Sequence, residues 1–94
     1  MFVVQRSGDL FLGIPYDIAL FAKILLYVSE QVGLKGKLIE VQIIDAHIYD
    51  NQHAAVREYL FQETFDSPEY IHENAALTLI NYKHGPVITA KVAI

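Results

Sequence analysis

At 94 residues, the chain is long enough for one small domain with a single core. Its net charge is −4, its pI is about 5.4, and its seven lysines and arginines are spread along the sequence, which argues against a nucleic-acid or anionic membrane surface. The sequence has no cysteine, no signal-peptide pattern and no apolar segment of the ~20 residues that span a bilayer, so we expect a cytoplasmic protein.

The first half of the chain predicts a strand, a loop and a long helix. Residues 2–6 begin extended, and glycine and proline punctuate a loop over residues 7–15. The apolar segment 17–31 is too long for a strand and is followed by Gly33, a suitable helix C-cap. Because its polar stripe is narrow, we expect this helix to be buried on most sides.

The second half predicts a strand, a shorter helix and two final strands. Residues 37–49 form a long β-rich run. Asp50 or Asn51 can cap a helix that reaches about Gln62. Two short strands are expected to follow, over residues 76–81 and 87–94. The order β-α-β-α-β-β predicts a single α/β (α+β) domain over the whole chain, with a mixed sheet and two helices.

Arg6 and Ser7 are the first candidate ligand contacts. A guanidinium offers a bidentate charged fork and a hydroxyl offers a short neutral donor, which together suit a phosphate. Taken alone, such a pair is more often an ordinary surface arginine beside a serine.

Asp45, His47 and Tyr49 are the second group of candidates. They are alternate residues of a predicted strand and therefore project from the same face. An imidazole beside a phenol can donate to and accept from a sugar hydroxyl. The alternative interpretation is that these are half-buried strand residues whose polar tips are satisfied.

Other kinds of chemistry lack their sequence patterns. The four histidines show no metal-ligand spacing and no cysteine can contribute a thiolate, so no metal site is expected. No Gly-x-Ser-x-Gly motif marks a hydrolase nucleophile. We therefore assign no catalytic residue to this chain.

The sequence resembles the thymidylate synthase family. The resemblance is carried by the run Arg-Ser-Gly-Asp-Leu-Phe-Leu-Gly-Ile-Pro-Tyr-Asp-Ile over residues 6–18, by Asp-Ala-His-Ile-Tyr over residues 45–49, and by the closing segment over residues 81–94. It covers nearly the whole chain and corresponds to the C-terminal third of a complete enzyme. The resemblance therefore implies the C-terminal portion of the thymidylate synthase fold.

The resemblance also implies nucleotide contacts. The family residues that match Arg6 and Ser7 hold the phosphate of a pyrimidine deoxynucleoside monophosphate, and those that match His47 and Tyr49 contact its 3′ hydroxyl. The position of Asp17 matches the residue that contacts the base.

The implied cofactor is 5,10-methylenetetrahydrofolate. The residues that match its contacts in the family are Asp9, Gly13 and Ala93. The last of these lies in the closing segment that folds over bound folate.

The most important departure from the family pattern is the missing nucleophile. The family uses a cysteine upstream of the position of Arg6, and this chain has none. The chain alone is therefore expected to be inactive. We expect it to form a homo-oligomer or to associate with a complementary N-terminal chain that carries the cysteine.

Other positions also differ from the family, among them Ile43 and Ile44, which stand where small glycine residues are usual before the aspartate. Asp17 stands where asparagine is usual and where deoxycytidylate hydroxymethylases carry aspartate; a carboxylate only accepts hydrogen bonds and so suits the exocyclic amine of cytosine. Alternatively, Asp17 is a helix N-cap. Gln52 replaces a common histidine, and Gln62 replaces an arginine that often ends the second helix.

Two functions remain open at this point. The first is the nucleotide- and folate-binding portion of a pyrimidine C5 one-carbon transferase, acting in dUMP methylation or dCMP hydroxymethylation. The second is a non-catalytic fragment or split subunit that binds a nucleotide or a partner protein. Hydrophobic residues make up 53% of the chain and charged residues only 19%, below the usual ~25%. This excess indicates either a buried partner surface or a densely packed core.

Overall fold

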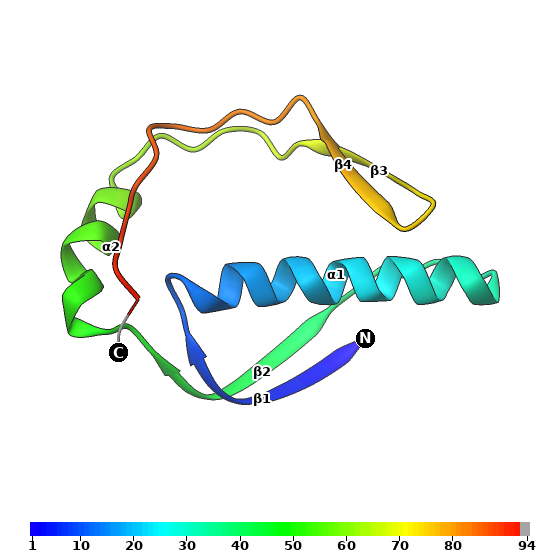
Figure 1. Ribbon diagram of the computed structural model, residues 1–94, viewed down its shortest axis with the longest axis horizontal. Coiled ribbons are helices and arrows are strands. Elements are labelled where there is room, and N and C mark those ends of the chain that lie inside the picture. Colours follow the sequence, from blue (N-terminus) through cyan, green and yellow to red (C-terminus); the bar gives the residue numbers. More distant parts are fainter. Residues whose placement is uncertain (93–94) are drawn as a thin grey trace. The chain divides into compact units, whose positions relative to one another are not determined.

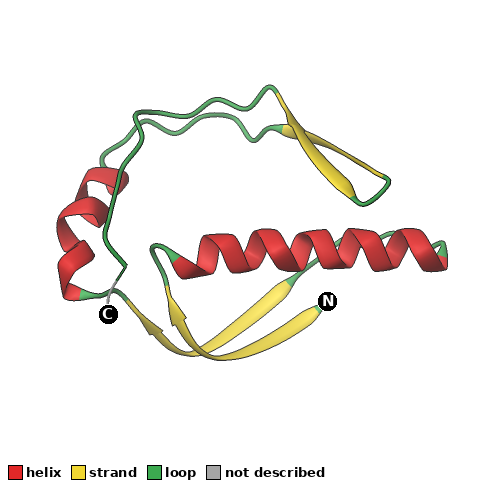
Figure 2. Cartoon of the chain, viewed as in Figure 1, coloured by secondary structure: helices red, strands yellow, loops and turns green. Residues whose placement is uncertain are grey.

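The computed structural model describes residues 1–92. The chain forms two compact units, and the boundary between them in the sequence falls between Tyr49 and Asp50. The first unit contains two strands and a long helix, and the second contains a short helix and two strands. Figure 1 labels these elements along the chain. The order of element types matches the prediction, although its last two strands fall partly on other residues, and the expected α/β class with two helices is confirmed. The strands form two separate sheets, one parallel and one antiparallel, where the sequence predicted one mixed sheet (Figure 2).

The first unit is a β-α-β element. Strands β1 (Phe2–Asp9) and β2 (Glu40–His47) pair in parallel and are joined by helix α1 (Gly13–Val32). Parallel strands need a long crossover between them, and α1 supplies it. The ladder extends one residue beyond β1, because the backbone N–H of Leu10 donates to the His47 carbonyl at 2.9 Å.

Strand β1 is longer than the sequence predicted. The expected end at Arg6 and the expected loop over residues 7–15 are wrong, since pairing continues to Asp9, opposite His47. The turn before α1 is limited to residues 10–12. Backbone pairing with β2 therefore overrides the glycine and aspartate in this stretch, which favour a loop.

Helix α1 begins earlier than the predicted start at Asp17. Pro15 lies in its first turn, where a backbone N–H would have no partner within the helix, so proline is tolerated. The N-cap residue is Leu12, not Asp17. The predicted C-cap is confirmed: Gly33 has a φ of 70°, and its N–H donates to the Ser29 carbonyl.

The core of the first unit lies where α1 begins. Among the described residues, Ile14 is the one hydrophobic residue that is buried. Its side chain lies against the backbone at Gly8. The prediction that α1 is buried on most sides is wrong for this chain by itself, since Leu20 is 54% exposed. A two-stranded sheet is too narrow to cover a helix of 20 residues.

The second unit begins with a 3-10 turn, Asp50–Gln52, followed by helix α2 (His53–Leu60). Gln52 is the N-cap residue of α2, and no side chain caps the helix. The predicted capping by Asp50 or Asn51 is therefore wrong, because the tight turn places both residues before the N-cap position.

A β-hairpin follows α2. Strand β3 (Glu69–Glu73), which the sequence did not reveal, pairs antiparallel with β4 (Ala76–Ile80), which was predicted. The two turn residues, Asn74 and Ala75, have φ values of 51° and 63°, as a type I′ turn requires.

The predicted final strand over residues 87–94 is wrong in its described part, because residues 87–92 form no strand. Residues 93–94 lie outside the described residues. The carbonyls of Pro86 and Lys91 in this part of the chain accept hydrogen bonds from side-chain amides.

Candidate functional site

The parallel register brings residues of the 6–18 and 45–49 stretches together. Ser7 lies opposite Asp45, and Asp9 lies opposite His47. Residues two apart on a strand share a face, and paired residues do so as well. These four polar side chains therefore line one face of the β1–β2 pair.

His47 and Tyr49 are in direct contact. Their ring centroids are 4.8 Å apart, with the rings nearly perpendicular at 79°. The Nδ1 atom of His47 lies 3.2 Å from the Asp45 backbone carbonyl and 3.6 Å from Asp45 Oδ1. Because both oxygens accept hydrogen bonds, the tautomer that fits them carries its proton on Nδ1 and leaves Nε2 as an acceptor.

Gly8 lies between Ser7 and Asp9 and is buried. The register of β1 on β2 keeps the same offset from Phe2–Glu40 to Asp9–His47. A Cβ atom on Gly8 would lie 2.5 Å from Ile14 Cδ1 and 3.3 Å from Ile43 Cγ2, so the absence of a side chain lets Ile14 approach the strand.

Arg6 is exposed, and Ser7 is half-buried. They are neighbours on β1, which pairs with β2 without a shift of register on either side of them.

Asp17 accepts a hydrogen bond from Gln5, a residue that no sequence motif singled out. Gln5 Nε2 donates to Asp17 Oδ2 at 2.9 Å in a partly buried position. The two residues are twelve apart in sequence, and the available signal was a polar glutamine within the otherwise apolar start of β1. The alternative that Asp17 caps the helix is wrong, since it lies within α1.

The three residues predicted to contact folate fall in different settings. Asp9 Oδ1 accepts hydrogen bonds from the backbone N–H groups of Phe11 and Leu12, at 3.1 and 3.3 Å. Gly13 is the first residue of α1, and a Cβ there would make an ordinary contact of 3.4 Å with Asp9 Cβ. Ala93 lies outside the described residues.

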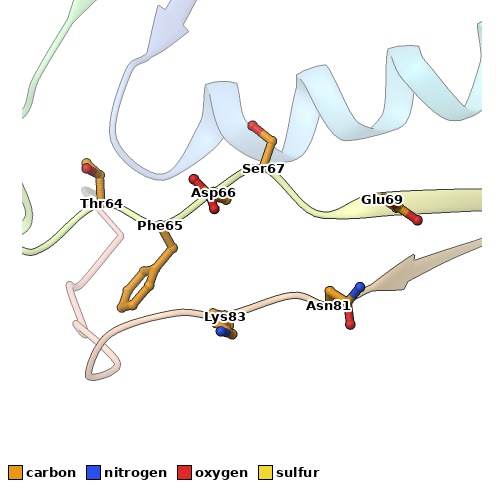
Figure 3. Close-up of a pocket in the computed structure, with 7 residues that line it drawn as sticks. All are labelled: Thr64, Phe65, Asp66, Ser67, Glu69, Asn81 and Lys83. Carbon is orange, nitrogen blue, oxygen red and sulfur yellow. The ribbon is translucent and has the colours of Figure 1, made fainter.

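A separate hollow of about 430 Å³ lies in the second unit, between two extended segments. Figure 3 shows Phe65 pointing from one segment toward the other, while Thr64 and Ser67 point away. None of the predicted site residues lines this hollow, and no sequence motif predicted it. Its lining is Thr64, Phe65, Asp66, Ser67, Glu69, Asn81 and Lys83.

Two further observations apply to residues 1–92. No three histidine, aspartate or glutamate side chains gather there in a way that could hold a metal ion. None of the helices in this part of the chain is both long and apolar enough to cross a membrane.

Comparison with known proteins identifies relatives along the whole sequence. The family model described as thymidylate synthase matches residues 1–94. The chain is 37% identical to the thymidylate synthase of Oenococcus oeni (strain ATCC BAA-331 / PSU-1), over 96% of this chain and 31% of that protein. It is 35% identical to that of Staphylococcus haemolyticus (strain JCSC1435), with the same coverage of each chain.

A third relative is the thymidylate synthase of Mycoplasma genitalium, which is 31% identical over 96% of this chain and 34% of its own length. The chain thus spans about a third of the length of the curated relatives that it matches.

Proposed function

The chain belongs to the thymidylate synthase family, and from this premise we propose that it is the nucleotide- and folate-binding portion of a pyrimidine C5 one-carbon transferase. This portion corresponds to the C-terminal third of the enzyme and acts as one domain over residues 1–94. The observation that carries the proposal is the pairing of Asp9 with His47, which joins the two motif stretches on one face of β1–β2.

His47 and Tyr49 bind the 3′ hydroxyl of the nucleotide sugar. With its proton on Nδ1, His47 offers Nε2 as an acceptor, and the neighbouring phenol can donate or accept. The edge-to-face ring contact fixes the two groups relative to each other, which lowers the entropy lost on binding.

Arg6 and Ser7 bind the phosphate. The exposed guanidinium provides charge and two parallel N–H donors, and the hydroxyl adds a short neutral donor.

Asp17 contacts the base and decides which base is preferred. The family relatives are thymidylate synthases, so methylation of deoxyuridylate is the first reaction to consider. An acceptor-only carboxylate nevertheless fits the exocyclic amine of cytosine better than uracil O4. We therefore propose a preference for deoxycytidylate, and hydroxymethylation of dCMP as the finer alternative to dUMP methylation.

Asp9, Gly13 and Ala93 are the proposed contacts of 5,10-methylenetetrahydrofolate, which supplies the one-carbon unit when bound. The geometry at Asp9 fits this role, because only Oδ1 accepts the two backbone N–H groups and Oδ2 can accept from a ring N–H. The same two backbone bonds orient the carboxylate.

The 94-residue sequence contains no cysteine and so supplies no thiolate nucleophile. We propose that a complementary N-terminal part carries the thiolate, in a cytoplasmic assembly that is a homo-oligomer or a pair of different chains. The open edges of the two-stranded sheet support this assembly, because such a sheet is marginal alone.

Calorimetric titration of the 94-residue chain with dUMP and dCMP tests the proposed site. Tyr49→Phe removes only the phenolic hydroxyl and should weaken binding by about 1 kcal/mol, or roughly fivefold. Tyr27→Phe makes the same change on an exposed residue of α1 and should leave the affinity unaltered.

The matching 2′,3′-dideoxynucleotides separate sugar contact from general packing. Because they lack the 3′ hydroxyl, the Tyr49→Phe variant should bind them as well as the original chain does. Absence of nucleotide binding by the chain, or an equal loss with both kinds of nucleotide, would contradict the proposed site.

A further inference from the structure

Three amide side chains from the region around α2 donate to the backbone of the C-terminal segment, residues 86–91. Gln62 Nε2 donates to the Pro86 carbonyl at 3.1 Å. Gln52 Nε2 and Asn51 Nδ2 both donate to the Lys91 carbonyl, at 3.2 and 3.4 Å. The two attachment points therefore lie at opposite ends of the segment.

The contact at Lys91 is the more protected of the two. Gln52 is fully buried, with 0% of its surface exposed, whereas the Gln62 contact is exposed. A buried amide donor costs free energy when it has no partner, so departure of the segment would leave Gln52 Nε2 either unpaired or newly solvated. Gln52 thus favours the attached position of the segment.

We propose that Gln52 is a positioning residue that fixes the C-terminal segment at Lys91, with Gln62 as the second attachment at Pro86. The proposal depends on the function proposed above in one respect only, namely that the closing segment over residues 81–94 contacts folate. The sequence places amides at the two positions where histidine and arginine are common in the family pattern. Because an amide does not ionise, this attachment does not depend on charge.

Limited proteolysis with trypsin measures how often the C-terminal segment is released at Lys91. Cleavage after Lys91 attacks the same carbonyl that accepts from Gln52, so the bond is protected while the attachment persists. Cleavage after Lys23, within α1, and after Arg57, within α2, reports unfolding of the two helices in the same sample. The rate at Lys91 relative to these sites therefore isolates local release.

Gln52→Glu keeps the size of the side chain but replaces its donor with an acceptor facing the Lys91 carbonyl. We expect cleavage after Lys91 to become roughly three- to tenfold faster at neutral pH, with unchanged rates in both helices. Gln31→Glu makes the same change on an exposed residue of α1 and should alter nothing. Gln52→His restores an N–H donor and should return the rate to within about threefold of the original.

An unchanged Lys91 rate in Gln52→Glu, with both helices protected, would overturn the proposal. Failure of Gln52→His to restore protection would also overturn it, because loss of the glutamine would then act through packing alone. If cleavage after Arg57 also becomes faster in Gln52→Glu, helix α2 has opened as well, and Gln62→Glu provides the test instead. This variant removes the donor at the exposed Pro86 attachment, and we expect faster cleavage after Lys91. Unchanged cleavage after Lys91 would contradict the proposal. No nucleotide or folate is present, so the result is independent of whether the ligand site is correctly assigned.

Discussion

Gln5 Nε2 donates a hydrogen bond to Asp17 Oδ2 at 2.9 Å and so links β1 to the first half of α1. An amide nitrogen only donates, so it holds the carboxyl group as an acceptor. Gln5 Oε1 is buried and has no hydrogen-bond partner among the described residues. The residue next to Arg6 therefore sets the orientation of the carboxylate that we assign to the base.

Asp17→Asn should reverse the choice of base. The original chain should bind deoxycytidylate more tightly than deoxyuridylate, because a carboxylate facing uracil O4 sets acceptor against acceptor. Such an unpaired group costs about 1–3 kcal/mol, or roughly 5- to 150-fold in affinity. The asparagine amide can instead donate to O4. Calorimetric titration of both proteins with both nucleotides measures the preference.

Asp50→Asn is the matched control for this substitution, since Asp50 is exposed in the 3-10 turn before α2. It should leave the preference as it was. Equal affinities of the original chain for the two nucleotides would show that Asp17 does not read the base.

Gly8→Ala should destabilise the first unit by about 1–3 kcal/mol, because the new methyl group would lie 2.5 Å from Ile14 Cδ1 in the core. Ile14→Val removes that atom and should recover part of the loss when combined with Gly8→Ala. Gly13→Ala is the control, since its methyl group meets only an ordinary contact of 3.4 Å. Urea unfolding of the four proteins measures these differences, and equal stability of Gly8→Ala and Gly13→Ala would disprove the close packing.

Ala75→Gly should stabilise the β3–β4 hairpin. Ala75 has a φ of 63°, a left-handed conformation that costs an L-residue with a Cβ about 1 kcal/mol and costs glycine little. Its neighbour in the type I′ turn, Asn74, already tolerates this conformation. Thermal unfolding should show a higher midpoint for Ala75→Gly, whereas Ala55→Gly, within α2, should lower it. A lower midpoint for both would refute the assigned turn.

Local features of the chain could be predicted from its sequence, whereas most features that the sequence did not predict depend on contacts between distant residues. The end of α1 at Gly33 follows from a single residue that accepts positive φ. The predicted strand over residues 37–49 is confirmed only for Glu40–His47, so Tyr49 lies beyond the strand and reaches His47 through a ring contact. Strand β3 was missed because its turn contains Ala75, which carries no turn signal.

The site itself depends on distant contacts that no local pattern encodes. The burial of Gly8 follows from the close approach of Ile14, and the orientation of the Asp17 carboxylate follows from its hydrogen bond with Gln5. The residues of the Asp-x-His-x-Tyr motif could be named from the sequence, but their position opposite Ser7 and Asp9 needed the register of a parallel pair.

The isolated chain should release no tritium from C5-labelled deoxyuridylate or deoxycytidylate. Exchange at C5 needs a nucleophile at C6, and no other side chain here replaces a thiolate as a soft nucleophile. A complete thymidylate synthase under the same conditions is the positive control. Release above background by the isolated chain would show that catalysis in this protein does not depend on a cysteine.

The chain should not remain a monomer at micromolar concentration. Helix α1 exposes Leu20, Ile24 and Val28, which are four residues apart and form one apolar stripe. Burying each side chain contributes about 1.5–3 kcal/mol, so the stripe favours association. Ile24→Lys places a charge in the middle of the stripe and should shift the equilibrium toward the monomer, whereas Gln31→Lys adds the same charge at an exposed polar position of α1 and should have little effect. Sedimentation velocity measures the distribution of species, and a single species of 10.6 kDa for the original chain would rule out association through this stripe.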